Sequence, residues 1–335
     1  MRGIISGYQF ESPIDEAVTI AMMLASIQRP TLETAPLFGI TANTPGTGKS
    51  QLAMGIASLA TGNNPAVHGF RDNEQEASKM LMSGLIQGTP HIIIDNVKLG
   101  VALGGDALCA ILSAPFYEDR VLGYSRTCKV PTRVLMAATG NNLKLTSDVT
   151  RRCLMIRLDS RCERPELRHF DKTFIQICKE QREPMLKALL TILSAYHAAE
   201  SPKVSNVRLG TFEAFSGEIC APLVWLGMED PAIGLAKADA DEGVAGLGEL
   251  LNIWQFEIFD NRVTTQELLK HAGVAEWFRA EFDDKGGATD RKVGRLLAKY
   301  AGRVIDGVRI VQAGVTRNYK IWQLENVNND ASLLV

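Results

Sequence analysis

The sequence lacks a long apolar run, a paired metal-ligand motif and an excess of charge of one sign. No run approaches the roughly 20 apolar residues of a membrane-spanning helix. The acidic Asp15 and Glu16 precede its most apolar stretch, residues 17–27, and such flanks are unlike a signal peptide. The 6 cysteines and 5 histidines form no CxxC pair and no His cluster at metal spacing. We therefore expect a reduced, cytoplasmic protein with no membrane partner.

Composition places the chain among globular proteins of more than one domain. With 36 Lys and Arg against 38 Asp and Glu, the net charge is -2, which excludes a uniformly basic surface but allows a local basic patch. Hydrophobic residues make up 46% of the chain, which excludes a disordered protein. A length of 335 residues suggests about two domains.

Apolar runs alternate with helical segments in the first half of the chain. This alternation predicts a doubly wound α/β domain with a parallel sheet. The expected strands are 37–42, 66–68, 90–94, 134–138 and 153–157, and the expected helices between them are 51–59, 74–86 and 107–112. The second half is expected to be mostly helical, with helices at 165–200, 211–226, 264–271 and 290–300, and two β-like runs at 308–311 and 319–324 joined through Gly314.

The segment TPGTGKS, residues 44–50, has the pattern of a phosphate-binding loop between a strand and a helix. Its glycines allow backbone N–H groups to surround phosphates at a helix N-terminus. Lys49 would neutralise phosphate charge, and the Ser50 hydroxyl would bind Mg²⁺. Asn43 stands where the usual pattern has glycine, and asparagine tolerates a positive φ. The expected ATP contacts are Asn43, Thr44, Pro45, Gly46, Thr47, Gly48, Lys49, Ser50 and Gln51.

Polar residues follow two of the apolar runs. Asp95 ends one run, where a phosphate-loop protein holds its Mg²⁺, although an acid there could also cap a turn. Asn96 comes next and can orient water but cannot accept its proton, so the catalytic base stays unassigned. After the run 134–138, an asparagine would orient water beside the γ-phosphate. We favour Asn141 over Asn142; a plain turn is the alternative.

Arg151 and Arg152 precede the run 153–157. An arginine at the end of a helix could reach a neighbouring subunit and stabilise transition-state charge there. Favourable interaction with the helix C-terminus is the alternative.

The order TPGTGKS, IIIDN, AATGNN and DVTRR resembles an AAA+ ATPase, and is most similar to the superfamily-three helicase-like ATPases of phages, plasmids and integrative elements. The resemblance covers residues 35–160 and implies a hexameric ring, ATP sites between subunits, single-stranded DNA in the central pore and a possible primase partner. Asn43 and Asn96 depart from the usual pattern.

Two basic segments are candidate DNA contacts. Residues 120–133 resemble the hairpin that these helicases insert at this place, with Arg126 and Lys129 in a polar turn; a solvated turn is the alternative. Residues 285–320 carry nine basic residues against two acidic ones, and Arg291, Lys292, Arg295 and Lys299 recur at helical spacing. Two helices followed by a hairpin resemble a winged helix, although such modules also bind proteins.

These observations predict five segments. They are an N-terminal helical segment at 1–34, a phosphate-loop ATPase core at 35–160, a helical lid or connector at 161–258, a winged-helix-like domain at 259–325 and a tail at 326–335. The expected function is an ATP-driven DNA motor, most simply a replicative helicase of a mobile element acting on single-stranded or forked DNA. The alternatives are a DNA-binding initiator or loader without unwinding activity, and a weakly hydrolysing, nucleotide-dependent regulator.

Overall fold

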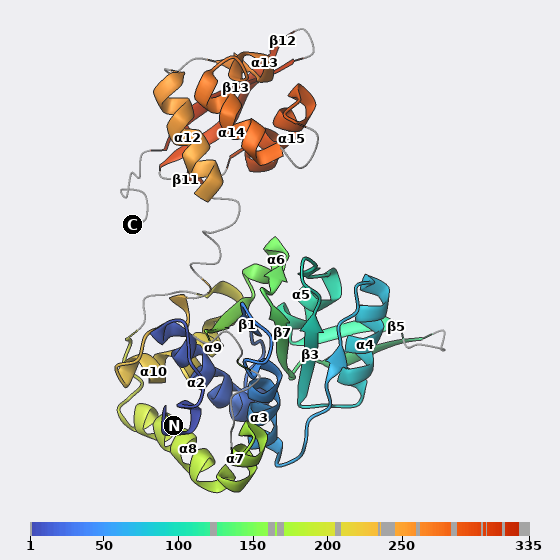
Figure 1. Ribbon diagram of the computed structural model, residues 1–335, viewed down its shortest axis with the longest axis vertical. Coiled ribbons are helices and arrows are strands. Elements are labelled where there is room, and N and C mark those ends of the chain that lie inside the picture. The colour runs from blue at the N-terminus through green and yellow to red at the C-terminus, as the bar shows by residue number, and fades with distance from the viewer. Residues whose placement is uncertain are drawn as a thin grey trace. The chain divides into compact units, whose positions relative to one another are not determined.

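Five short strands from the first half of the chain form one parallel sheet (Figure 1). In sheet order they are β2 (His68–Gly69), β3 (His91–Val97), β7 (Leu135–Asn141), β1 (Leu37–Ala42) and β9 (Cys153–Leu158). The expected α/β fold with a parallel sheet is therefore confirmed, and the weak strand expected at 66–68 is shifted to His68–Gly69.

The computed structural model divides into two units, Met1–Asp239 and Ala240–Val335. The described residues are 2–120, 126–159, 165, 171–204, 209–233, 235, 245–258, 262–282, 287–302, 304–305, 307–316 and 319–327.

The two faces of the sheet carry separate apolar clusters. On β3, Ile93 packs with α2 (Pro13–Gln28) and α3 (Lys49–Thr61), whereas Ile92 and Ile94 pack with α4 (Glu74–Ile86) and α5 (Asp106–Ser113). Burial on both faces explains why these strands are continuous apolar runs. Because β1, β3 and β7 are parallel, their carboxyl ends meet at one edge of the sheet, where ligands bind in such folds.

The N-terminal segment covers the outer edge of β9. The Glu11 N–H donates to the Arg157 carbonyl at 3.0 Å, and the Asp159 N–H donates to the Gln9 carbonyl at 2.9 Å. Asp15, at the start of α2, is 1% exposed and accepts the Arg157 N–H at 2.8 Å. The C-terminal end of this edge strand is thus paired with the N-terminal segment.

A helical layer follows the sheet. It contains α7 (Phe174–Glu180), α8 (Arg182–Ala198), a 3₁₀ turn (Gly210–Phe212), α9 (Glu213–Phe215), a π turn (Ser216–Cys220) and α10 (Ala221–Trp225). The helix expected at 211–226 is helical throughout Gly210–Trp225, but it passes through 3₁₀ and π turns and is not one regular α-helix. Pro222 has no N–H to donate to the Glu218 carbonyl, which favours the interruption.

The second unit has its own core around Trp254, Phe278 and Trp322. Its elements are α12 (Ala245–Glu257), β10 (Val263–Thr264), α13 (Thr265–Leu268), α14 (Ala272–Phe282), α15 (Asp290–Tyr300), β11 (Val304–Ile305), β12 (Val308–Thr316) and β13 (Tyr319–Asn326). The strands form an antiparallel sheet in the order β10-β13-β12-β11. The expected boundary at 258/259 falls within this unit, and tail residues 328–335 lie outside the described residues.

Two details of this unit differ from expectation. The sequence did not predict α14, whose first turn contains Gly273. A Cβ at that glycine would lie 2.5 Å from Glu257 Oε1 and 2.9 Å from Ile253 Cγ2, so the glycine allows α14 to pack closely on α12. Gly314 does not join two strands but lies inside β12, at an irregularity of the β12–β13 register.

Folding buries His91 at the start of β3, where its side chain is 8% exposed. Burial lowers the pKa of His91 from 6.5 to about 4. In that pH window the unfolded chain binds a proton that the folded chain excludes, so acidification costs about 1.4 kcal/mol of stability per pH unit. We expect His91→Gln to reduce this loss, measured by urea unfolding at pH 7, 6 and 5. His68→Gln on β2 is the control, and equal slopes for parent and His91→Gln would contradict the prediction.

Candidate functional site

The loop between β1 and α3 turns at two glycines. Gly46 and Gly48 have φ values of 75° and 90°, and Gly48 is the N-cap of α3. A Cβ at Gly48 would also lie 3.0 Å from the Tyr8 ring, so this position needs glycine for both its conformation and its contact. Asn43 does not have a positive φ. The expectation that asparagine is tolerated here because it can adopt a positive φ is therefore wrong. The two glycines make the turn after it.

Lys49 lies at the start of α3 with its ammonium group folded over the loop. Its Nζ donates to the Thr44 carbonyl at 3.2 Å and to Thr47 Oγ1 at 3.1 Å. Burial lowers the pKa of Lys49, and the nearby Asp95 carboxylate opposes that shift. The loop therefore holds a cation beside backbone groups at a helix N-terminus, an arrangement suited to phosphate.

Asp95 joins three segments through one oxygen. Its Oδ1 accepts the Ser50 hydroxyl at 2.5 Å and the Thr139 hydroxyl at 2.6 Å. A hydroxyl and a carboxylate are the hard oxygen ligands that Mg²⁺ binds together with phosphate and water. The described residues contain no group of three His, Cys, Asp or Glu side chains that could hold a metal alone. Ser50 and Asp95 thus fit a metal that arrives with a phosphate.

A β-bulge lies beside Asp95. In the β3–β7 register, Ile94 pairs with Ala138 and Val97 pairs with Gly140, so Asp95 and Asn96 together oppose the single residue Thr139. Asn96 has a φ of 58°, is exposed, and donates its backbone N–H to Thr139 Oγ1 at 3.0 Å. Sequence reasoning did not assign Thr139 a role.

The two candidate asparagines after β7 differ in their surroundings. The Asn141 Oδ1 atom is buried and has no hydrogen-bond partner among the described residues. Asn142 is exposed, has a φ of 45° and donates its N–H to the Ala42 carbonyl at 3.0 Å. An amide oxygen in need of a donor is suited to orient water, so the geometry favours Asn141.

The arginine pair is divided between two environments. Arg152 donates through Nε to Ser113 Oγ at 2.7 Å and through Nη1 to the Asp148 carbonyl at 2.6 Å, so it binds within its own chain. Arg151, next to α6 (Ser147–Thr150), is 53% exposed and pairs with Asp148 Oδ1 at 2.5 Å. Exposed ion pairs are weak, so this contact holds Arg151 less firmly than the internal contacts hold Arg152.

A cavity of about 520 Å³ opens beside the loop. Its walls come from the loop, the N-terminal segment and α7. The Tyr8 and Phe174 rings meet edge to face there, with centroids 5.2 Å apart. Gln51 also lines it, and the Gln51 Oε1 atom is buried without a partner among the described residues. The remaining lining residues that the structure describes are Gly3, Ile4, Ser6, Gly7, Gly46, Thr47, Gly48, Pro165, Lys172, Thr173 and Ile177.

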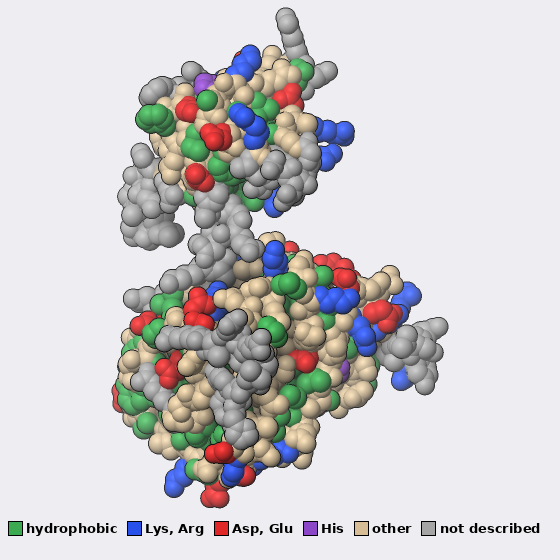
Figure 2. Space-filling model, viewed as in Figure 1, with side chains coloured by type: hydrophobic (Ala, Val, Ile, Leu, Met, Phe, Trp, Pro, Cys, Tyr) green, Lys and Arg blue, Asp and Glu red, His purple; other side chains and the backbone are tan. Residues whose placement is uncertain are grey.

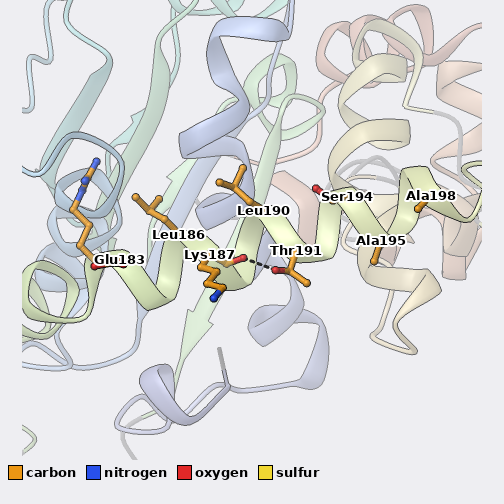
Figure 3. Close-up of a pocket in the computed structure, with 9 residues that line it drawn as sticks. Glu183, Leu186, Lys187, Leu190, Thr191, Ser194, Ala195 and Ala198 are labelled. Carbon is orange, nitrogen blue, oxygen red and sulfur yellow. Dashed lines mark hydrogen bonds between the residues drawn. The ribbon is translucent and has the colours of Figure 1, made fainter.

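An open groove of about 720 Å³ runs along α8 (Figure 3). Leu186 and Leu190 lie on it, with the charged Glu183 and Lys187 beside them. None of the residues expected to bind ATP or Mg²⁺ lines this groove in the described part of the chain. It is therefore separate from the candidate site.

The hairpin expected at 120–133 is present as β5 (Phe116–Arg120) and β6 (Thr127–Pro131). Its turn, residues 121–125, lies outside the described residues, and Arg126 flanks it. Lys129 was expected in the turn, and this is wrong. It lies on β6 opposite Glu118, with its Nζ 5.0 Å from the centroid of the Phe116 ring. The pairing of β5 and β6 extends to Arg120 and Thr127, so Lys129 falls within the strand, and Ser78 on α4 donates to Asp119 on β5 at 2.8 Å.

The basic residues of the second unit differ in their exposure. Figure 2 shows Lys and Arg side chains on the side of this unit where α15 lies. Arg291, Arg295 and Lys299 are exposed on α15, opposite the buried Val293 and Leu297. Lys292 is half-buried and donates to the Gly287 carbonyl at 2.9 Å. Lys285, Arg303 and Arg317, which also belong to the basic segment, lie outside the described residues.

Comparisons with known proteins give weak similarity. No family model matches the sequence, and no curated protein matches it. The structure is similar to the JC virus helicase with a TM-score of 0.29 and 10% identity, over 73% of this chain and 66% of that one, just under two thirds. It is similar to the C-terminal region of NrS-1 with a TM-score of 0.41 and 11% identity, over 95% of this chain and 76% of that one. Both TM-scores are too low to bear on function. None of the described helices is both long and apolar enough to cross a membrane.

Proposed function

We propose that this chain is an ATP-hydrolysing motor that acts on DNA, most simply a replicative helicase of a phage or mobile element. The observation that carries the proposal is the contact of Ser50 with Asp95 at 2.5 Å, next to a loop that turns at two glycines and holds Lys49. This arrangement combines a phosphate cradle, a cation and a pair of hard metal ligands at one edge of a parallel sheet.

The residues of the site support hydrolysis by water. The loop and Lys49 would hold the β- and γ-phosphates, and Ser50 and Asp95 would hold Mg²⁺, which neutralises phosphate charge when bound. The Asn141 amide would orient the attacking water. Asn96 cannot accept its proton. The loose transition state of phosphoryl transfer depends more on position and charge than on a strong base.

The cavity beside the loop supports a nucleoside as the group attached to these phosphates. Its volume lies within the range of ligand pockets, and its walls combine two aromatic rings and apolar side chains with polar side chains that could bind a nucleoside. Tyr8 and Phe174 would contact a base, with Gln51 as a polar partner at the wall.

A ring of subunits, hexameric by the resemblance, would bring Arg151 to the phosphates of a neighbour. The exposure of Arg151 and the internal contacts of Arg152 favour Arg151 for this role. In such a ring, single-stranded DNA would pass the β5–β6 hairpin, and a primase is the expected partner protein.

The second unit supports a further DNA contact. The order of helix, strand, helices and hairpin supports a winged-helix interpretation, in which α15 would be the recognition helix. The exposed Arg291, Arg295 and Lys299 are suited to phosphate contact. A separate unit with one basic helix face is equally compatible with an initiator or loader. Strand displacement on a forked duplex distinguishes a helicase from an initiator or a loader. Steady-state ATPase activity distinguishes a helicase, an initiator or a loader from a weakly hydrolysing regulator.

Lys49→Ala tests the nucleotide site. We expect hydrolysis to be lost and ATP affinity to fall roughly ten- to hundredfold, because the change removes a hydrogen-bonding cation from the phosphates. ATP affinity should be measured by calorimetry and turnover by phosphate release. Lys79→Ala, on the exposed face of α4, is the matched control. Turnover that is equal in the two variants would remove the site assignment.

Arg151→Ala tests action between subunits. We expect ATP binding to be nearly intact and turnover to fall by about 10³-fold or more, the scale of arginine fingers. A mixture of Arg151→Ala and Lys49→Ala subunits should recover activity, because some interfaces then pair an intact loop with an intact arginine. No recovery in a mixture that mass measurement shows to co-assemble would contradict the role.

Charge removal at the two basic surfaces should have different effects on DNA. Arg126→Ala with Lys129→Ala should keep basal ATPase activity but lose stimulation by single-stranded DNA, because the motor no longer holds the strand. Arg291→Ala with Arg295→Ala should lower DNA affinity and reduce the salt slope by roughly one unit for each phosphate that is no longer neutralised, while ATPase activity at saturating DNA survives.

Both effects are measured by DNA titration across a salt series, with ATPase assays beside it. Lys79→Ala with Lys179→Ala, both exposed in the first unit, is the control. DNA binding by the α15 variant that equals the parent at every salt concentration would make the second unit a protein-contact module.

A further inference from the structure

Thr139 is a buried polar residue that neither the phosphate loop nor the expected catalytic set includes. It lies on β7 with 1% of its surface exposed. A hydroxyl in such a place needs partners, because burying it unpaired is costly. Its two partners are both at the site: it donates to Asp95 Oδ1 at 2.6 Å and accepts the Asn96 N–H at 3.0 Å.

The β-bulge explains why one threonine meets both residues. Asp95 and Asn96 occupy the space opposite Thr139, where an unbulged register would place one residue. The extra residue turns the backbone so that the Asn96 N–H leaves the regular ladder, at a φ of 58° that is uncommon outside glycine. The hydroxyl supplies the acceptor that the ladder no longer offers.

The strand returns to regular pairing directly after the bulge. The Val97 carbonyl passes close to Gly140, where a Cβ would lie 3.1 Å from that oxygen. Thr139 thus hydrogen-bonds to the bulge residues Asp95 and Asn96, and Gly140 leaves room for the Val97 carbonyl that follows them.

The carboxylate of Asp95 is held in a fixed orientation by this arrangement. Its Oδ1 accepts the hydroxyls of Ser50 and Thr139. Among the described residues, no hydrogen bond falls on its Oδ2, so that oxygen stays available for a metal or a metal-bound water. A carboxylate that is oriented before the metal arrives loses less freedom when it binds.

We propose that Thr139 is the positioning residue of the metal site: its hydroxyl fixes the Asp95 carboxylate and the Asn96 backbone together, so that the metal and the attacking water have defined places. This inference rests on the proposed ATPase function and deepens it. Thr139 touches neither phosphate nor water in this role. It acts through Asp95 and Asn96.

The test compares Thr139→Val, which keeps the branched shape and removes the hydroxyl, with Thr139→Ser, which keeps the hydroxyl. ATPase activity is titrated with Mg²⁺ for each variant and the parent. We expect the Mg²⁺ concentration for half-maximal activity to rise ten- to hundredfold in Thr139→Val, the scale seen when outer partners of metal ligands are removed. In Thr139→Ser it should stay close to that of the parent.

Two further measurements separate positioning from general structure. ATP affinity in excess chelator, without Mg²⁺, should be unchanged in Thr139→Val, because the loop and Lys49 are intact. Thr132→Val is the matched control, since Thr132 is equally buried just before β7 and donates its hydroxyl to the Ala114 carbonyl far from the phosphate loop in sequence. Its Mg²⁺ requirement should equal that of the parent. Thr139→Ala replaces the valine variant if thermal unfolding shows that the latter does not fold.

The outcomes are distinct. A parent protein that hydrolyses no ATP with Mg²⁺ would overturn the proposed function itself. A parent that hydrolyses ATP while the hydroxyl-free variant keeps its Mg²⁺ requirement would overturn only the role of Thr139. An equal rise in Thr132→Val and Thr139→Val would also overturn it, because the effect would then be structural.

Discussion

The hydrogen bonds on a single carboxylate oxygen, Oδ1 of Asp95, connect the parts of the candidate site. Ser50 lies 45 residues before Asp95 and Thr139 lies 44 residues after it, yet both hydroxyls converge on this atom. They converge because β1, β3 and β7 are neighbours in a parallel sheet and end at the same edge. The loop that follows β1, the bulge at the end of β3 and the asparagine at the end of β7 are therefore brought together by backbone pairing.

Glycines set how closely the surrounding elements approach the site. Gly48 allows the Tyr8 ring against the phosphate loop, and a Cβ at Gly55 would lie 2.3 Å from Cδ1 of Phe174. The close packing of α7 on α3 places Phe174 beside Tyr8 at the mouth of the cavity. The N-terminal segment thus contributes to the site, although the phosphate-loop motif begins more than 30 residues later. The apolar wall beside the loop depends on both segments.

Buried polar contacts also hold the β5–β6 hairpin to the sheet. Arg29 is 3% exposed and donates to the carbonyls of Leu32, Thr132 and Val134. Burial, with a smaller contribution from Arg133, lowers the pKa of Arg29 to about 10. Three carbonyl acceptors compensate for the cost of burying this cation. These contacts fix the segment between the hairpin and the start of β7, the strand that carries Thr139 and Asn141.

The sequence by itself determined the α/β fold, the glycine-rich turn between β1 and α3, and the positions of Asp95 and Asn141 at strand ends, because apolar runs and glycine-rich turns are local signals. It did not reveal α14, since Gly273 is tolerated only through its contact with α12. It did not reveal Thr139 or the cavity wall at Tyr8, because neither residue belongs to a motif. It also left Arg151 and Arg152 equivalent. Only the tertiary structure distinguished them, since a hydrogen bond to Ser113 joins residues 39 positions apart and depends on how α5 packs beside α6. Local patterns encode which elements form, but pairing register and close packing decide which side chains meet.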